Sequence, residues 1–81
     1  MHLNIITHNK KIFEGTIHTI TLPGINGSFQ VLPGHAPLIT TLTSGQVVYT
    51  HESEKSELPI GEGIVSVHDN QVTLLVETSI S

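Results

Sequence analysis

The sequence predicts a single all-β domain, an antiparallel β-sandwich that takes up residues 1–81. Short runs rich in β-branched residues recur along the chain, at spacings near the roughly 8 to 12 residues expected of sandwich strands. Gly, Pro and Asn, which favour turns, separate these runs. The apolar spacing of an amphipathic helix is not sustained over any window of about 11 residues. Together these observations favour two sheets packed face to face.

The predicted strands are joined by connections too short for the crossover helices of parallel sheets. In chain order they are Leu3–Thr7, Lys11–Phe13, Thr16–Leu22, Ser28–Leu32, Leu38–Leu42, Gln46–Thr50, Ser56–Ile60, Ile64–His68 and Val72–Glu77. The last has the clearest alternation, because Val72, Leu74 and Val76 fall on one face. Asp69-Asn70 just before it suits a tight hairpin, since Asn tolerates a positive φ at little cost.

Two segments have a less regular pattern. In Thr16–Leu22, Ile17 falls on one face while Ile20 and Leu22 fall on the other. This strand is therefore expected to bulge or to be covered on both faces. The charged stretch His51–Glu57, which lies between apolar runs, is predicted to be a solvated hairpin loop.

The composition argues against several classes of partner. The chain has three Lys and Arg against seven Asp and Glu, a formal net charge of -4, and no Trp. Nucleic acid is not expected as a partner, since phosphates need clustered cations and single strands need stacking aromatics. Cys is absent, which removes disulfides and thiolate metal sites. No apolar run approaches the roughly 20 residues of a membrane-spanning helix, so membrane association is expected only through another protein.

The titratable residues do not form a catalytic or metal-binding pattern, so no residue is assigned a catalytic, cofactor-binding or metal-binding role. The six histidines lack the His-x-His spacing that places two imidazoles on one strand face. They are His2, His8, His18, His35, His51 and His68. Two alternatives stay open: a small β-sandwich metal- or ligand-binding module that uses the histidines, and a small hydrolase that uses His35 or a glutamate.

Carboxylates and glycines likewise give no sign of a substrate site. Glu52, Glu54 and Glu57 lie in the predicted loop, where solvated side chains are the default. The glycines lead into strands, whereas a phosphate-binding loop leads into a helix. Neither a nucleotide nor another small-molecule substrate is therefore predicted.

Two Leu-Pro-Gly units, which begin at Leu22 and Leu32, frame the most informative segment. Each Pro-Gly pair fits a type II turn, because Pro fixes φ at the second position and Gly supplies a positive φ at the third. After the second unit, Ala36 precedes Pro37 and is pushed toward an extended conformation. The result is a stiff loop that presents His35, and stiffness lowers the entropy lost on docking.

An ordered set of residues along the chain matches one known family. The set is Leu3–Thr7, Ile12–Gly15, Leu22–Gly24, Gly27, Pro33–Leu38, Leu42, Gly45, Val47 and Gly61–Glu77. It resembles the N-terminal domain of the epsilon subunit of rotary ATP synthases. A lone Pro-Gly-His would be weak evidence, but this ordered set covers almost the whole chain.

The resemblance implies an antiparallel β-sandwich of about ten short strands in the rotating central stalk. It implies a non-catalytic subunit that couples c-ring rotation to the gamma subunit during ATP synthesis. One sheet face would pack on gamma, and loops at the base would rest on the c-ring. The implied place is peripheral, on the cytoplasmic face of a bacterial inner membrane, through the ATP synthase complex. The implied contact residues are Asn26, Gly27, Ser28, Gly34, His35, Ala36 and Pro37.

The sequence departs from the family pattern at three places. Ser28 stands where the family often has an acidic residue, so a charge contact to basic c-ring loops is expected to be missing or moved. Gly61-Glu62-Gly63 stands where paired glycines are usual. The sequence stops at Ser81, before the family's helical hairpin, which suggests a short form or a truncated chain. Inhibition by that hairpin and ATP binding are therefore not expected of it.

Overall fold

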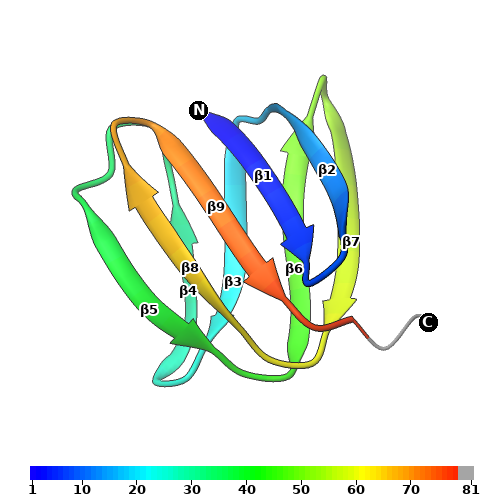
Figure 1. The fold of residues 1–81 in the computed structure, drawn as a ribbon. Coiled ribbons are helices and arrows are strands. Elements are labelled where there is room, and N and C mark those ends of the chain that lie inside the picture. The colour runs from blue at the N-terminus through cyan, green and yellow to red at the C-terminus, as the bar shows by residue number, and fades with distance from the viewer. Residues whose placement is uncertain (79–81) are drawn as a thin grey trace.

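The computed structural model describes residues 1–78 and consists of β-strands joined by short turns (Figure 1). The strands of this part are β1 (His2–Thr7), β2 (Lys10–Thr16), β3 (Thr19–Gly24), β4 (Gly27–Val31), β5 (Leu38–Leu42), β6 (Gly45–His51), β7 (Glu54–Ile60), β8 (Gly63–His68) and β9 (Gln71–Val76). The described residues thus hold nine strands where the family resemblance implied about ten. Among them, no helix is long and apolar enough to cross a membrane.

The strands form one hydrogen-bonded path that curls back on itself. Its order is β2-β1-β9-β8-β5-β3-β6-β7, and β4 pairs with the free side of β3. We call β2-β1-β9-β8-β5 the front sheet and β4-β3-β6-β7 the rear sheet, as they lie in Figure 1. The two sheets meet at a corner, where Gly24 of β3 pairs with Leu42 of β5. The predicted sandwich is therefore confirmed only in part, because its two faces belong to one continuous curled sheet and not to two separate sheets.

One pairing corrects the prediction of a wholly antiparallel fold. β1 and β9 run parallel, with Leu3 opposite Val72 and Ile5 opposite Leu74. A parallel pair needs a long connection, and here the connection is the rest of the domain, which leaves β1 and returns at β9. The turn residues in the sequence therefore do not indicate this pair, because they report only on strands that follow one another along the chain.

The core lies between the two sheets and is almost wholly aliphatic. Alternate residues of most strands point into it, as in β9, where Val72, Leu74 and Val76 are all buried. The predicted alternation of this strand is confirmed. The remaining buried apolar residues are Leu3, Ile5, Ile17, Ile20, Leu22, Val31, Leu42, Val47, Tyr49, Ile60, Val65 and Val67. Thr7 is the one buried polar residue among those described.

The segment 16–22 is not one strand, as predicted, but the corner between two. β2 ends at Thr16 and β3 begins at Thr19, so that Ile17 and His18 carry the chain from the front sheet to the rear. The amide of Ile17 donates to the carbonyl oxygen of Met1, which directly precedes β1 of the front sheet, at 2.8 Å. His18 donates its amide to the rear sheet, at 2.9 Å from the carbonyl oxygen of Thr50. The change of parity in the sequence reflects this change of sheet.

The first Pro-Gly pair is also not the predicted turn. Pro23 and Gly24 are the last residues of β3, and the chain turns at Ile25-Asn26 instead. Gly24 is needed for space: a Cβ there would lie 2.7 Å from the carbonyl oxygen of Gly27 and 2.8 Å from the ring of Phe29. The positive φ of this hairpin, 124°, falls on Gly27.

The other predicted turns have mixed outcomes. Pro33-Gly34 is a turn as predicted, with φ of 85° at Gly34. Asp69-Asn70 is confirmed as a tight hairpin turn, with φ of 51° and 60°. The predicted loop His51–Glu57 is wrong in extent, because only Glu52-Ser53 form the turn and β7 begins at the next residue. Charged side chains on an edge strand such as β7 are common, since they discourage pairing with another chain.

Candidate interaction surfaces

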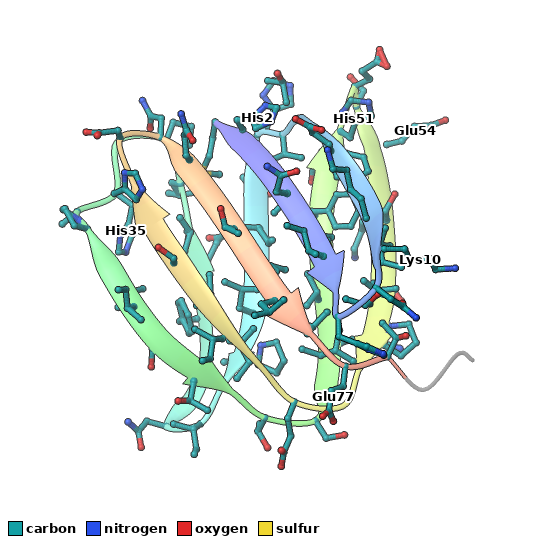
Figure 2. All side chains as sticks on the ribbon, in the orientation of Figure 1. His2, Lys10, His35, His51, Glu54 and Glu77 are labelled. Atoms are coloured by element: carbon teal, nitrogen blue, oxygen red, sulfur yellow. The ribbon has the colours of Figure 1, made fainter. Side chains whose placement is uncertain are left out.

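The seven residues predicted as contacts lie in two exposed places, at the two ends of β4. Asn26 lies in the β3–β4 turn, Gly27 and Ser28 begin β4, and residues 34–37 lie in the loop between β4 and β5. Residues 29–33, the rest of β4 and the two residues after it, separate the two groups and span about 16 Å where extended. Figure 2 shows His35 at the tip of its loop, near the upper left edge of the molecule. The structure therefore does not bring the two groups into one docking edge.

The β3–β4 turn borders a shallow apolar groove. β4 and β5 diverge from the corner at Gly24, and the space between them has a volume of about 290 Å³. Its lining includes Ile25, Phe29 and Leu38, and Ile25 is 61% exposed. This end of the molecule can therefore accept an apolar side chain of a partner beside the turn.

The loop 34–37 is held by hydrogen bonds on both sides. The amide of His35 donates to the carbonyl oxygen of Leu32, at 3.1 Å, which closes the Pro33-Gly34 turn. The imidazole Nδ1 of His35 lies 2.7 Å from the carbonyl oxygen of Ala36, so Nδ1 carries the hydrogen and donates. These bonds fix the position of His35, which is a structural residue at an exposed surface.

An apolar row on the outer surface of the front sheet was not predicted. Ile64 of β8 pairs with Leu75 of β9, which pairs in turn with Ile6 of β1. Ile64 and Leu75 are 50% and 54% exposed, and Ile39 on the neighbouring β5 is 76% exposed. We call these four residues, Ile6, Ile39, Ile64 and Leu75, the front face. Their side chains lie on the side of the sheet that points away from the core.

The sequence carries a signal for the front face in its apolar doublets. In Ile5-Ile6, Leu38-Ile39, Ile64-Val65 and Leu74-Leu75, one residue faces the core and its neighbour faces out, because strand side chains alternate. An apolar residue on the wrong parity in four strands of one sheet indicates a second apolar surface.

The outer surface of the rear sheet has a different character. Outward side chains there include Thr21, Gln30, Val48, Lys55 and Glu57, a mixture of polar, charged and apolar groups. The front face also lies beside Asn4 of β1, whose Oδ1 is buried and lacks a hydrogen-bond partner in the described part of the chain. Buried polar atoms are normally paired. Because its exposed side chains include Ile39, Ile64 and Leu75, the front sheet is the side that better fits a docked partner.

The histidines do not converge. His51 Nδ1 donates to the carbonyl oxygen of Thr16, at 2.7 Å, and its ring packs edge-on against Phe13 with centroids 5.4 Å apart. This contact ties the edge of the front sheet to the rear sheet. His68 lies beside Asp69, with Nδ1 3.5 Å from Oδ2. Within residues 1–78, no group of three or more His, Asp or Glu is placed to hold a metal ion, and the metal-binding alternative gains no support.

One charged cluster lies at the exposed edge formed by β1 and β2. Glu14 accepts hydrogen bonds from Lys11 Nζ and from His2 Nε2, the latter at 3.2 Å. Two hydrogen bonds hold the pKa of the Glu14 carboxyl below its usual value of 4.5. The bond from Lys11 has the larger effect and the bond from His2 the smaller. Since the group is solvent-exposed, its effect on stability is expected to be small.

The Glu14 cluster predicts a specific pH dependence. A depressed carboxyl pKa stabilises the fold above the unfolded-state value and loses this contribution as the pH falls through the folded-state value. The variant Lys11→Gln removes the donor with the larger effect. It should therefore move the titration midpoint of the Glu14 carboxyl upward, as followed by carboxyl NMR shifts. Lys10→Gln is the control, because Lys10 makes no described bond to Glu14. Equal midpoints in the two variants would contradict this assignment.

Comparison with known proteins gives a consistent result. Residues 1–81 match the family model of the ATP synthase delta/epsilon chain, beta-sandwich domain. The ATP synthase epsilon chain of Chlorobaculum tepidum is 44% identical over 77 residues, covering 93% of this chain and 86% of that protein. The epsilon chain of Geobacter sulfurreducens is 38% identical over 79 residues, covering 98% of this chain and 57% of that protein. The chain thus spans little more than half of several relatives.

A solved structure supports the fold. A chain of the Euglena gracilis mitochondrial ATP synthase, solved with its F1 part and c-ring, superposes with a TM-score of 0.86 at 23% identity. The match covers 91% of this chain and 48% of that one. The nine strands, their curled arrangement and the family match over the whole sequence agree. The chain therefore belongs to the delta/epsilon chain family of ATP synthases, of which it carries the β-sandwich domain.

Proposed function

We propose that this chain acts as a non-catalytic central-stalk subunit of a proton-translocating ATP synthase, coupling c-ring rotation to the gamma subunit during ATP synthesis. The observation that carries the proposal is the front face, an apolar surface on a domain of the epsilon family. Similar proteins were solved in assemblies described as F1 with c-ring and as central stalk with c-ring. The chain is then peripheral, on the cytoplasmic face of a bacterial inner membrane, and reaches the membrane through the complex.

The gamma subunit is assigned to the front face. Ile39, Ile64 and Leu75 are large, exposed and neutral, as expected of the centre of a stable interface. The loop 34–37 leads directly into β5, which carries Ile39, so one partner can cover both. A stable contact of this kind buries on the order of 1,600 Å² in total. The rotation of the c-ring would then be transmitted to gamma through the packed interface, without any covalent change in this chain.

The c-ring is assigned to the end that carries Asn26, Gly27 and Ser28. Ser28 lacks the charge that the family often has there, and Glu62 offers a substitute. Gly63 pairs with Leu42, which pairs with Gly24, so the exposed Glu62 belongs to the same end of the molecule as the turn. A basic loop of the ring would find its carboxylate partner at Glu62.

Reconstitution tests the assignment of gamma. The double variant Ile64→Glu, Leu75→Glu places two charges in the proposed interface and should weaken binding to the cognate gamma subunit at least about tenfold, which is about 1.4 kcal/mol. Both side chains are already exposed, so the fold should persist, as checked by circular dichroism. Gln30→Glu on the rear sheet is the control and should bind as the wild type does.

The same variants separate binding from coupling. Membranes stripped of the native subunit and rebuilt with the wild-type chain should regain proton-driven ATP synthesis, and those rebuilt with the double variant should not. The proposal fails if the wild-type chain does not bind gamma, or if the rebuilt enzyme couples fully without the chain. Equal binding by the double variant and Gln30→Glu would reject the front face as the gamma surface.

A further inference from the structure

Asn70 joins two turns that lie far apart in the sequence. Its side-chain Oδ1 accepts a hydrogen bond from the amide of Gly34, at 2.6 Å, across 36 positions of the chain. Its own carbonyl oxygen accepts the amide of His2, at 2.8 Å. Figure 1 shows the β8–β9 turn and the β4–β5 loop side by side at the upper left. We propose that Asn70 is a positioning residue that fixes the loop 34–37 for docking, an inference that rests on the proposed function.

The geometry of the second Pro-Gly turn explains why Gly34 needs this partner. In such a turn the bond runs from the fourth residue to the first, here from the His35 amide to Leu32. The amide of Gly34, at the third position, is left without a partner inside the turn. Asn70 supplies the acceptor, so the turn is tied to the rest of the molecule at its sharpest point.

The residue at position 70 must meet two demands. The backbone there has a φ of 60°, which Asn adopts more readily than most residues because its side chain is short and polar. The side chain must also reach Gly34 with an acceptor. Asp69, the other residue of the turn, has a similar φ of 51°, but its carboxylate faces its neighbour His68 at 3.5 Å. Asp69 is therefore a natural control for the backbone effect alone.

The tie also sets the loop relative to the front face. Asn70 lies between β8 and β9, which carry Ile64 and Leu75, and is bonded to the first residue of β1. The loop is thus held in a fixed position relative to the same strands that present the proposed gamma surface. A loop held in its bound shape loses less entropy on association, which raises affinity. Asn70 would act through the loop, without itself having to touch the partner.

The test uses three variants of the chain with two readouts. Asn70→Gly keeps the turn and removes the acceptor, Asn70→Asp keeps an acceptor, and Asp69→Gly changes the turn without touching the loop. The first readout is hydrogen exchange at the Gly34 amide, measured by NMR on the chain alone. The second is affinity for the cognate gamma subunit.

In Asn70→Gly, exchange at Gly34 should accelerate about tenfold and the affinity should fall about threefold to tenfold, the worth of one hydrogen bond. Asp69→Gly should match the wild type in both, and Asn70→Asp should restore protection of Gly34. Unchanged exchange in Asn70→Gly overturns the tie itself. Faster exchange with unchanged affinity overturns the docking role. A wild-type chain that does not bind gamma overturns the proposed function and this docking role together, whatever the exchange shows.

Discussion

Leu74→Ala is expected to lower the free energy of unfolding by about 2–5 kcal/mol, the range for truncating a buried leucine. Leu74 is fully buried at the centre of β9, between β1 and β8, so the cavity left by the change has little freedom to collapse. Urea unfolding followed by circular dichroism measures the change. Since a domain this small has a modest reserve of stability, the variant should be partly unfolded near physiological temperature.

Leu75→Ala is the matched control, because the same substitution is made one residue further along the same strand. Leu75 belongs to the front face and is 54% exposed, so its truncation should change stability by less than about 0.5 kcal/mol. The pair separates the core from the front face. If Leu75→Ala cost as much as Leu74→Ala, the outer position of Leu75 in the free chain would be wrong.

Gly63→Ala is expected to destabilise the fold by about 1–3 kcal/mol, the cost of forcing an extra carbon into a packed place. A Cβ at this position would lie 2.6 Å from the carbonyl oxygen of Leu75 and 2.6 Å from Cγ1 of Val76. The first of these atoms belongs to the backbone of the paired strand, which cannot move without disturbing the β8–β9 ladder. Thermal unfolding would show the loss as a lower Tm.

Gly61→Ala provides the comparison for Gly63, because Gly61 lies two residues earlier, in the connection that leads into β8. A Cβ at Gly61 would meet Glu77 at 3.6 Å, an ordinary contact distance. We expect a change of less than about 0.5 kcal/mol. The two glycines of Gly61-Glu62-Gly63 therefore differ in purpose, and equal losses in both variants would contradict the close approach seen at Gly63.

Strand positions could be predicted because their determinants are local. Alternation in β9 and the turn residues Asp69-Asn70 depend on neighbours in sequence, and the structure agrees with both. The strand order could not be predicted, because the parallel pairing of β1 with β9 depends on contacts between the two ends of the domain. The turn predicted at Gly24 is wrong for a similar reason. The small size of Gly24 serves a contact with Phe29 across the hairpin, whereas the pattern indicated a turn.

The candidate surfaces divide in the same way. The turn at Pro33-Gly34 could be predicted from two residues, and its hydrogen bond is present. Its tie to Asn70 joins distant positions that carry no joint sequence signal. For the front face, the sequence indicates only that each apolar doublet places one residue on each side of its strand. Recognising that the doublets share one sheet required the strand order, which only the structure gives.

The parallel pairing of β1 and β9 also bears on how the chain reaches its native state. Residues 2–6 find their partners at residues 71–75, so the front sheet cannot close until the ribosome has released nearly the whole domain. Contacts between such distant positions slow folding, because the entropy of closing the loop is lost before the contacts form. During synthesis the free edge of β1 and its apolar doublet Ile5-Ile6 remain available to other chains. For this domain, the period before β9 emerges is the one in which aggregation competes with folding.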